Sequence, residues 1–408
     1  MAAKRLLVLG GGFAGVWAAL SAVEEARHHG GPLDVTLVSA TPNLVLRPRL
    51  YQADPASLQA PLADTVGPVG ACLLEGYVTD LDVAAQEVSV CTPQGEALSL
   101  PYDAVVLALG SVLRRDLPGA EHAYDVDSGD GAVSLDRRLM DAMAGAAPGD
   151  ATFAIVGAGF TGLELATELR PRLAQQFGEA RAAAARIVLV DGKANAETAL
   201  GAGPAPAIGA ALDRARVDRR FGRRVVEIGP AGLLLDDGEW IASRTVILSG
   251  GLQASPLTVR LGVQLDELGR APVGEDLRVV GCRSVFAAGD CARALVDQVH
   301  VAPMSCQHAM PMGRSAGRNA ARALLGLAPE PYRQLTYVTC LDLGAAGAVF
   351  TTGWERNLLL TGAAAKKVKR AINAGIRPPT GSPEEILAAA RVRDDGRLVE
   401  RLMAYAAA

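Results

Sequence analysis

Short apolar runs alternate along this chain with longer, alanine-rich stretches of helical pattern. The first run lies at 5–8 and leads into glycines at 10–15. A helical pattern follows at 16–28, and a second apolar run lies at 35–38. Apolar strands that alternate with helices are typical of a parallel sheet covered by helices. The pattern therefore predicts an α/β fold.

The same plan recurs about 147 residues later, since the glycine turn at Gly10 has its counterpart at Gly157. In the second unit the strands are expected at 153–156 and 187–190, with a helix at 163–174 between them. A repeated strand, glycine turn and helix is the signature of a nucleotide-binding unit. Two such units are therefore expected in one chain.

Other segments complete the predicted architecture. Alternating polar and apolar residues at 77–83 and 87–91 predict a small antiparallel element. Apolar strands are expected at 104–109, 245–248 and 284–290, each of which runs into glycine. A long helix is expected at 310–325.

Composition narrows the function classes. The 408 residues are 50% hydrophobic and 21% charged, enough for two or three packed domains. A net charge of −4 offers no positive field for nucleic acid, so no nucleic-acid partner is expected. The six cysteines include no closely spaced pair, so neither a metal site nor a sequence-local dithiol is expected. With no apolar run of about twenty residues, a cytoplasmic protein that at most contacts a membrane peripherally is expected.

The glycines carry the clearest chemistry. Gly10, Gly12 and Gly15 fit the pattern G-x-G-x-x-G between a strand and a helix. The first allows a tight turn, the second lets a pyrophosphate approach the backbone, and the third lets the helix pack on its strand. In the second unit the corresponding residues are Gly157, Gly159 and Gly162.

The residue that ends the second strand of each unit distinguishes the two sites. Asp191 in the second unit can accept hydrogen bonds from both ribose hydroxyls and would repel a 2′-phosphate, which favours NADH over NADPH. Lys193 weakens that preference, and a solvated strand end is the alternative for Asp191. The first unit has Ser39 at this position, which can still hydrogen-bond a ribose.

Taken together, these motifs resemble those of type II NADH dehydrogenases, a family of flavoproteins with two dinucleotide-binding domains. The resemblance rests on L-V-L-G-G-G-F-A-G at 7–15, Y-D-A-V-V-L-A-L-G-S at 102–111, I-V-G-A-G-F-T-G-L-E-L-A at 155–166, G-G-L-Q-A-S-P at 250–256 and V-F-A-A-G-D-C at 285–291. It implies FAD in the first site, NADH in the second, and a hydrogen bond between Asp290 and the ribityl chain of the flavin.

The resemblance also implies a domain plan. The expected fold is α/β with two Rossmann-like dinucleotide-binding domains and a C-terminal α+β segment. The FAD domain is discontinuous, at 1–115 and 265–328, and the NAD(P)H domain at 116–264 is inserted into it, while 329–408 forms the C-terminal segment. The residues expected to line the cofactors are Gly10, Gly12, Phe13, Ala14, Gly15, Ser39, Gly110, Gly157, Gly159, Gly162, Asp191, Gly251, Gly289, Asp290 and Ala309.

Three residues are candidates for the reaction itself. The resemblance implies that Glu164, expected in the first helical turn after Gly162, positions cofactors or handles protons, although an acid there also stabilises a helix dipole. Gln307 matches a family glutamine that lines the flavin and quinone pocket. His308 beside it could donate to a reduced flavin or be a packed, neutral histidine.

Two features leave the electron acceptor open. Pro311 stands where the family has a second glutamine, and its lack of a donor puts a quinone in doubt. Cys306 lies in the same stretch, but no cysteine occurs between Cys91 and Cys282, so the paired-cysteine chemistry of sulfide:quinone reductases is disfavoured. Cys306 is then expected to be a small buried side chain.

The C-terminal segment bears on membrane contact. The stretch 363–379 carries five cations and no acid, and it resembles the family sequence that leads into membrane-anchoring helices. Basic helices can dock on anionic lipid. The following residues, 386–408, mix charges with alanine and leucine and are expected to form a solvated helix or one that packs in a homodimer.

The leading hypothesis is therefore an FAD enzyme that oxidises NADH and passes electrons to a second acceptor, with quinone as the family default. A flavoprotein of the same ancestry that uses oxygen, a biosynthetic intermediate or a small redox protein is the alternative. A nucleotide-binding scaffold or redox sensor with negligible turnover is the third hypothesis.

Overall fold

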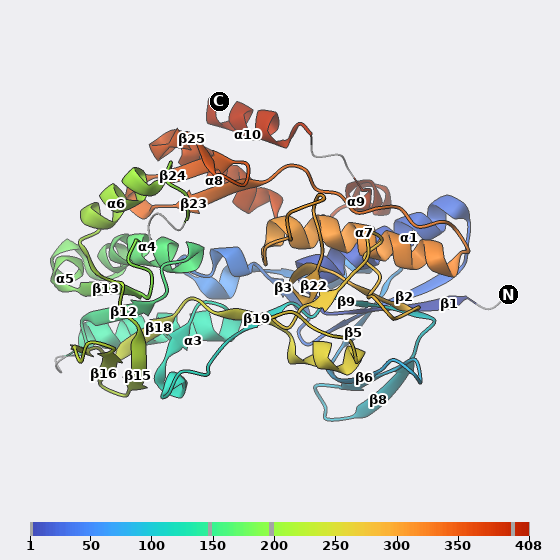
Figure 1. The fold of residues 1–408 in the computed structure, drawn as a ribbon, viewed down its shortest axis with the longest axis horizontal. Helices are drawn as coiled ribbons and strands as arrows, with labels where there is room; N and C mark the ends of the chain where they lie inside the picture. The colour runs from blue at the N-terminus through green and yellow to red at the C-terminus, as the bar shows by residue number, and fades with distance from the viewer. Residues whose placement is uncertain (1–2, 146–148, 196–199, 393–395, 408) are drawn as a thin grey trace.

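The computed structural model describes residues 3–145, 149–195, 200–392 and 396–407. Two parallel sheets, each covered by helices, form its framework, and a third layer of strands and helices packs against both (Figure 1). The helices, in chain order, are α1 (Phe13–His29), α2 (Ala63–Val66), α3 (Gly129–Ala144), α4 (Phe160–Phe177), α5 (Glu179–Ala184), α6 (Ala205–Arg214), α7 (Cys306–Leu324), α8 (Gly362–Gly375), α9 (Pro383–Ala390) and α10 (Leu398–Ala407).

The first sheet has five parallel strands in the order β21-β9-β1-β2-β5. Its strands are β1 (Lys4–Leu9), β2 (Leu33–Ser39), β5 (Cys72–Glu75), β9 (Ala104–Leu107) and β21 (Val285–Ala287). Leu6, Val8 and Leu9 in β1 are fully buried, which contributes roughly 1.5–3 kcal/mol per side chain. Helices α1 and α7 cover one side of this sheet (Figure 1).

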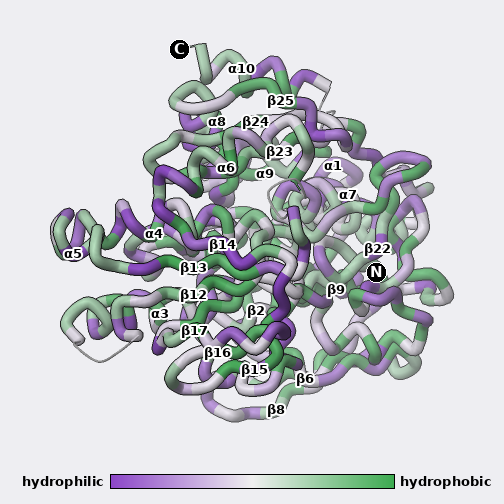
Figure 2. Tube along the Cα trace, turned by 60° about the vertical axis from the view of Figure 1, so that its left-hand side comes forward, coloured by the Kyte–Doolittle hydropathy of each residue, from purple (hydrophilic) through white to green (hydrophobic). Residues whose placement is uncertain are grey.

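The second sheet repeats this architecture in the order β11-β18-β12-β13-β14. Its strands are β11 (Tyr124–Asp125), β12 (Thr152–Val156), β13 (Arg186–Asp191), β14 (Val217–Phe221) and β18 (Thr245–Leu248). Hydrophobic residues colour β12 and β13 along most of their length (Figure 2). The predicted α/β class with two Rossmann-like units is confirmed.

Two short antiparallel strands join the sheets where the chain crosses between them: β10 (Ser111–Leu113) leaves the first sheet and β19 (Leu252–Ala254) returns to it. All strands of the second sheet lie between these crossings in sequence, while β21 of the first sheet lies after them. This connectivity suits a first domain interrupted by a second, and we retain the limits 1–115, 116–264 and 265–328 as a proposal.

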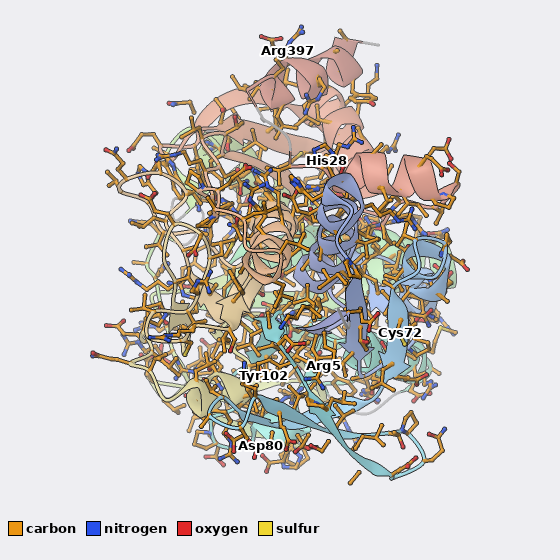
Figure 3. All side chains as sticks on the ribbon, turned by 90° about the vertical axis from the view of Figure 1, so that its right-hand side faces the viewer. Arg5, His28, Cys72, Asp80, Tyr102 and Arg397 are labelled. Atoms are coloured by element: carbon orange, nitrogen blue, oxygen red, sulfur yellow. The ribbon has the colours of Figure 1, made fainter. Side chains whose placement is uncertain are left out.

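Smaller antiparallel sheets flank the two units. The expected element near 77–91 is a three-stranded sheet of β6 (Tyr77–Asp82), β7 (Glu87–Cys91) and β8 (Ala97–Pro101). A second such sheet is formed by β15 (Val225–Gly229), β16 (Gly232–Leu235) and β17 (Trp240–Ala242). Figure 3 shows Asp80 of β6 at the bottom of the molecule and Arg397, just before α10, at its top. The remaining short strands are β3 (Asn43–Val45), β4 (Gln59–Pro61), β20 (Ala271–Pro272) and β22 (Ala292–Arg293).

The C-terminal segment folds back on the rest of the chain. The antiparallel strands β23 (Val338–Asp342), β24 (Ala348–Thr352) and β25 (Asn357–Thr361) carry α8 and α10, and α9 packs on α1. The hydroxyl of Ser21 in α1 donates to the carbonyl oxygen of Ala390 in α9 at 2.7 Å. The expected single helix at 386–408 is therefore wrong: two helices bury apolar residues such as Ile386 and Leu402 within the chain. Packing of this segment in a homodimer stays a prediction. Residues 393–395 and 408 lie outside the described part.

Helix α7 begins at Cys306, four residues before the expected start, so Pro311 lies inside it. A proline cannot donate to the carbonyl four residues earlier, which here belongs to Gln307. The side chain of Gln334 supplies the missing donor, since its Nε2 lies 3.2 Å from that oxygen. This compensation lets the helix run through the proline.

Across the described residues, no helix is both long enough and apolar enough to cross a membrane.

Candidate functional site

The outer glycines of both turns are required by the packing of the chain itself. Gly10 and Gly157 have φ values of +111° and +106°, which side chains rarely tolerate. A Cβ at Gly15 would lie 1.7 Å from the carbonyl oxygen of Gly10, and one at Gly162 would lie 1.9 Å from that of Gly157. These four glycines therefore bring each helix directly against its own turn.

The middle glycines, Gly12 and Gly159, differ in one respect that points to a ligand. A Cβ at either position would meet no atom within 4 Å, and their φ values of −80° and −73° suit any residue. They are the N-caps of α1 and α4, where no side chain caps the helix and the first turn carries no acid. Open space at the positive end of a helix fits a pyrophosphate, so both turns fit a dinucleotide.

The strand ends next to these turns differ as expected. Asp191 accepts a hydrogen bond from the backbone N–H of Ala158 at 2.7 Å and another from that of Lys193 at 2.8 Å. Its carboxylate is thereby held beside the second glycine turn. Ser39 is buried, and its hydroxyl donates to the carbonyl oxygen of Thr41 at 2.7 Å. The hydroxyl of Ser39 is therefore engaged in a local turn, and its contact with a ribose stays a prediction.

Asp290 lies in a polar cluster at the carboxyl end of β21. The hydroxyl of Ser111 donates to Asp290 Oδ2 at 2.6 Å, and Arg47 donates to the carbonyl oxygen of Ser111 at 3.3 Å. Arg47 also pairs with Asp127 at 2.6 Å. Burial raises the pKa of the Asp290 carboxyl. Sequence reasoning missed Arg47 and Asp127, because nothing in their local patterns places them near this strand end.

Close packing of small residues brings α7 to the first glycine turn. A Cβ at Gly313 would lie 2.2 Å from the carbonyl oxygen of Ala14, and one at Gly289 would lie 3.0 Å from the Cβ of Ala14. Ala309 is 3.4 Å from the same position at Gly289, and Phe13 is buried beside Ala14. The structure thus gathers Phe13, Ala14, Gly289 and Ala309, and the N-terminus of α7 lies next to them.

The crossings between the two parallel sheets contain the remaining predicted glycines. Gly110 immediately precedes β10, and Gly251 immediately precedes β19. The backbone of Gly110 accepts from the thiol of Cys291 at 3.2 Å, next to Asp290. Gly110 therefore lies at the first site, and Gly251 follows β18 at the carboxyl edge of the second sheet.

Glu164 is not in the first turn of α4. The helix begins at Phe160, so Glu164 is its fifth residue, and the first turn contains no acid. Its side chain is buried and accepts from Lys369 Nζ at 2.7 Å and from the backbone N–H of Asp342 at 2.9 Å. The alternative that Glu164 stabilises the helix dipole from the first turn is therefore not supported. Glu164 instead joins α4 to the C-terminal segment.

Glu164 belongs to a buried cluster drawn from three distant parts of the chain. The hydroxyl of Tyr51 donates to Asp342 Oδ2 at 3.0 Å, and Lys366 pairs with the same carboxylate. Burial raises the pKa values of Glu164 and Tyr51. Burial alone would lower the pKa of Lys369, but the negative charge of Glu164 raises it above its ordinary value.

This cluster corrects the expectation for the basic stretch 363–379. Two of its five cations, Lys366 and Lys369, point inward to carboxylates, and Lys369 is only 7% exposed. Lys367, Arg370 and Arg377 remain exposed. Sequence reasoning missed the inward pair because its partners lie outside the stretch, although the absence of acids within it was a usable signal.

Gln307 and His308 both turn toward the C-terminal sheet. The side-chain amide of Gln307, oriented to satisfy both atoms, donates to the carbonyl oxygen of Val338 at 2.7 Å and accepts from its N–H at 3.2 Å. His308 is 1% exposed, with Nδ1 2.9 Å from the hydroxyl of Ser305 and its ring 5.5 Å from that of Tyr337. Burial lowers the pKa of His308 to about 4, so it is neutral near pH 7. Catalytic roles for both residues stay predictions.

His308 is expected to make the fold sensitive to acid. Its folded-state pKa of about 4 lies below the ordinary value of 6.5, so the unfolded chain binds this proton first. The contribution of neutral His308 to the free energy of unfolding is complete above pH 6.5 and is lost as the pH falls toward 4. The loss amounts to about 2 kcal/mol between pH 7 and 5. Urea unfolding at both pH values should show a smaller loss for His308→Gln than for the wild type. Equal losses would contradict the assignment.

The cysteines give no support to paired-cysteine chemistry. All six are free thiols, and burial raises the pKa of Cys306 to about 11, so its thiol is protonated near pH 7. Among the described residues, no group of three or more histidine, cysteine or acidic side chains could hold a metal ion.

Comparison with known proteins identifies the family. The pyridine nucleotide-disulphide oxidoreductase family model matches residues 4–313, a region that includes both glycine turns and β21. The chain belongs to this family. An NADH dehydrogenase-like protein of Mycobacterium tuberculosis (strain CDC 1551 / Oshkosh) is 42% identical over 397 residues, which cover 95% of this chain and 98% of that protein.

A second sequence relative and one solved structure are also similar to this chain. A type II NADH:quinone oxidoreductase of Mycobacterium tuberculosis (strain ATCC 25618 / H37Rv) is 28% identical, covering 71% of this chain and 67% of that protein. The NDH2 of Plasmodium falciparum in complex with NADH has a similar fold, with a TM-score of 0.78 at 13% identity over 95% of this chain and 97% of that chain. This pyridine nucleotide-disulphide oxidoreductase is therefore an enzyme whose family uses a flavin and a nicotinamide dinucleotide.

Proposed function

We propose that this oxidoreductase holds FAD in the turn at Gly12, takes hydride from NADH bound at the turn at Gly159, and reduces a quinone. The observation that carries the proposal is the pair of open helix N-termini at Gly12 and Gly159, of which the second has a carboxylate, Asp191, beside it. The relative named as a type II NADH:quinone oxidoreductase supports the quinone. When bound, the flavin accepts hydride from NADH and passes the electrons to the acceptor.

The protein's own part is positioning. The N-termini of α1 and α4 hold the two pyrophosphates, and the packing of Ala14 against Gly289 and Gly313 fixes α7 beside the first of them. The Ser111 hydroxyl donates to Asp290 Oδ2, which leaves Oδ1 of the same carboxylate to accept a hydrogen bond from a ribityl hydroxyl.

Proton supply belongs to the buried cluster. Lys369 Nζ carries protons held between Glu164 Oε1 and the carbonyl oxygen of Cys340, at 2.7 and 3.1 Å. An ammonium in this position can hand a proton to a reduced acceptor and recover it through Glu164, whose pKa is raised by burial. The exposed residues Lys367 and Arg370 of α8, together with Arg377 just after this helix, provide peripheral contact with anionic lipid.

The choice of NADH over NADPH depends on Asp191. We expect Asp191→Ser to raise the KM for NADH about tenfold, because the charged hydrogen bond to the ribose is lost. The preference for NADH over NADPH should narrow by a similar factor, because the variant no longer repels the 2′-phosphate of NADPH. Steady-state kinetics with both donors measure this. The control is Asp218→Ser, because Asp218 is an aspartate of the same sheet that pairs with Arg186 at 2.8 Å. An unchanged preference in Asp191→Ser would remove Asp191 from the donor site.

A different acceptor is the second candidate function. Pro311 offers no side-chain amide, and the amide of Gln307 is engaged by Val338, so neither is available to a quinone carbonyl. This arrangement favours oxygen, a small organic substrate or a small redox protein.

One experiment separates the candidates. The purified protein is reduced anaerobically with NADH and then offered a short-chain quinone, oxygen or ferricyanide, while the flavin absorbance is followed. Rapid reoxidation by quinone supports the proposal. Reoxidation only by other acceptors supports the second candidate, and a bound flavin that NADH never reduces would favour a sensor without turnover.

A further inference from the structure

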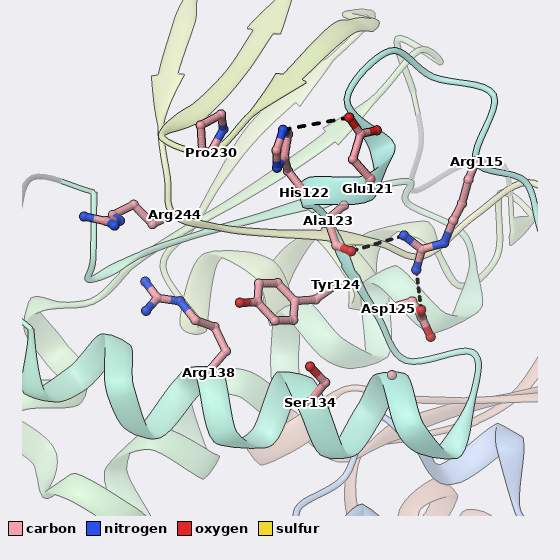
Figure 4. A pocket seen from close by; sticks show the side chains of 11 residues that line it. Arg115, Glu121, His122, Ala123, Tyr124, Asp125, Ser134, Arg138, Pro230 and Arg244 are labelled. Atoms are coloured by element: carbon pink, nitrogen blue, oxygen red, sulfur yellow. Dashed lines mark hydrogen bonds and ion pairs between the residues drawn. The ribbon is translucent and has the colours of Figure 1, made fainter.

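We propose that the amino edge of the second sheet carries a binding site for a small sugar phosphate, separate from both dinucleotide turns. The site is a hollow of about 490 Å³, a volume within the range of small-molecule sites. Its walls come from β11 and the segment before it, from Gly131, Ser134 and Arg138 of α3, and from the loops that precede β16 and β18 (Figure 4).

The position of this hollow excludes the cofactors as its occupants. Arg244 immediately precedes β18, and Asp150 lies two residues before β12, so both mark the amino ends of parallel strands. Gly159, Asp191 and Gly251 all follow the carboxyl ends of strands of the same sheet. The length of the strands therefore separates the hollow from the nicotinamide dinucleotide.

The charges in the hollow favour an anion. Arg138 Nη2 lies 3.3 Å from Asp150 Oδ1, and Arg244 Nε lies 3.8 Å from the same oxygen. Among the ion pairs of the described residues, Asp150 is the one carboxylate within 4.0 Å of either guanidinium, so at this end of the hollow two positive charges face one negative charge. Arg138 Nε also donates to the Thr245 hydroxyl at 3.1 Å, and the acids Glu121 and Asp125 line the rest of the hollow. The contact of Arg244 exceeds hydrogen-bond length and its side chain is 51% exposed, so it can turn toward a ligand.

The other groups at this end complete an oxyanion site. Figure 4 shows the Tyr124 hydroxyl directed toward the space between Arg138 and Arg244, with the Ser134 hydroxyl rising from α3 below the ring. Arginine and hydroxyl donors of this kind suit a phosphate monoester. Arg115 belongs to the wall rather than to the donor set, because it is engaged by Asp125 at 2.5 Å and by two backbone carbonyls.

The residues at the far end of the hollow indicate the chemistry of the part of the ligand beyond its phosphate. Glu121 and His122 lie there with the backbone of Ala123, and eight of the eleven lining residues have a charged or hydrogen-bonding side chain. A polar lining of this kind suits hydroxyl groups better than an apolar body. The volume left beyond a phosphate accommodates a sugar ring.

Calorimetric titration tests the site with glucose 6-phosphate as the probe. The protein is first saturated with FAD and NAD⁺ so that neither turn is free for a phosphate. We expect glucose 6-phosphate to bind, glucose not to bind, and inorganic phosphate to bind more weakly than the ester. Arg244→Gln should weaken the binding of glucose 6-phosphate by about tenfold or more, and Tyr124→Phe by a few-fold.

The matched control is Arg260→Gln, because Arg260 is 55% exposed and also pairs with one aspartate, Asp80, at 3.0 Å. The affinity of Arg260→Gln for glucose 6-phosphate should equal that of the wild type. No binding to the wild type, or equal binding to Arg244→Gln, would overturn the site. Binding of inorganic phosphate as tight as that of the ester would overturn the sugar phosphate as its ligand.

Discussion

Gly12→Val is expected to give a folded protein that has lost its flavin. The backbone at Gly12 has φ −80°, and a Cβ there meets no protein atom within 4 Å, so the valine costs the fold little. The same side chain occupies the space that a pyrophosphate needs at the N-terminus of α1. Flavin absorbance per protein should fall by at least about tenfold, since a clash of this kind removes several kcal/mol of binding. The circular dichroism spectrum should stay unchanged.

Gly159→Val is the matched variant at the second turn, with the same open surroundings and a φ of −73°. It should keep its flavin and raise the KM for NADH by a comparable factor. Gly15→Val provides the opposite control, because its Cβ would lie 1.7 Å from the carbonyl oxygen of Gly10 and should unfold the protein. Equal loss of flavin in Gly12→Val and Gly159→Val would contradict the assignment of the flavin to the turn at Gly12.

Lys369→Met is expected to cost about 3–5 kcal/mol of unfolding free energy, since it leaves the carboxylate of Glu164 buried without its cation. Both side chains of this pair are less than 10% exposed, so water cannot take over the role of the ammonium. Urea denaturation measures the loss. Lys367→Met, an exposed lysine on the same helix, should change stability by less than about 0.5 kcal/mol.

The double variant Glu164→Gln with Lys369→Met separates the structural role of this pair from its proposed role in proton supply. Removing both charges should recover most of the lost stability, because no uncompensated charge remains. If Lys369 supplies a proton, the double variant should fold well, be reduced by NADH at the normal rate and be reoxidised slowly. Normal reoxidation would limit the pair to a structural role.

Local patterns were sufficient for the repeated units. The strand at Thr245–Leu248 has the expected limits, and the strands and glycine turns at Gly10 and Gly157 occur where the pattern predicts them. The antiparallel element near 77–91 is also present, with one further strand. These features depend on residues adjacent in sequence, because a strand, a tight glycine turn and a helix start are each fixed by a few neighbours.

The sequence by itself therefore determined the two dinucleotide-binding units, their open helix N-termini and the contrast between Ser39 and Asp191. Only the tertiary structure decided how Glu164 and Gln307 are used. Glu164 pairs with Lys369 and Gln307 with Val338, partners supplied by the C-terminal segment. The physical reason is that a buried charge or amide takes whichever partner the docked segments bring within hydrogen-bond distance, and no local pattern in this chain encodes that docking.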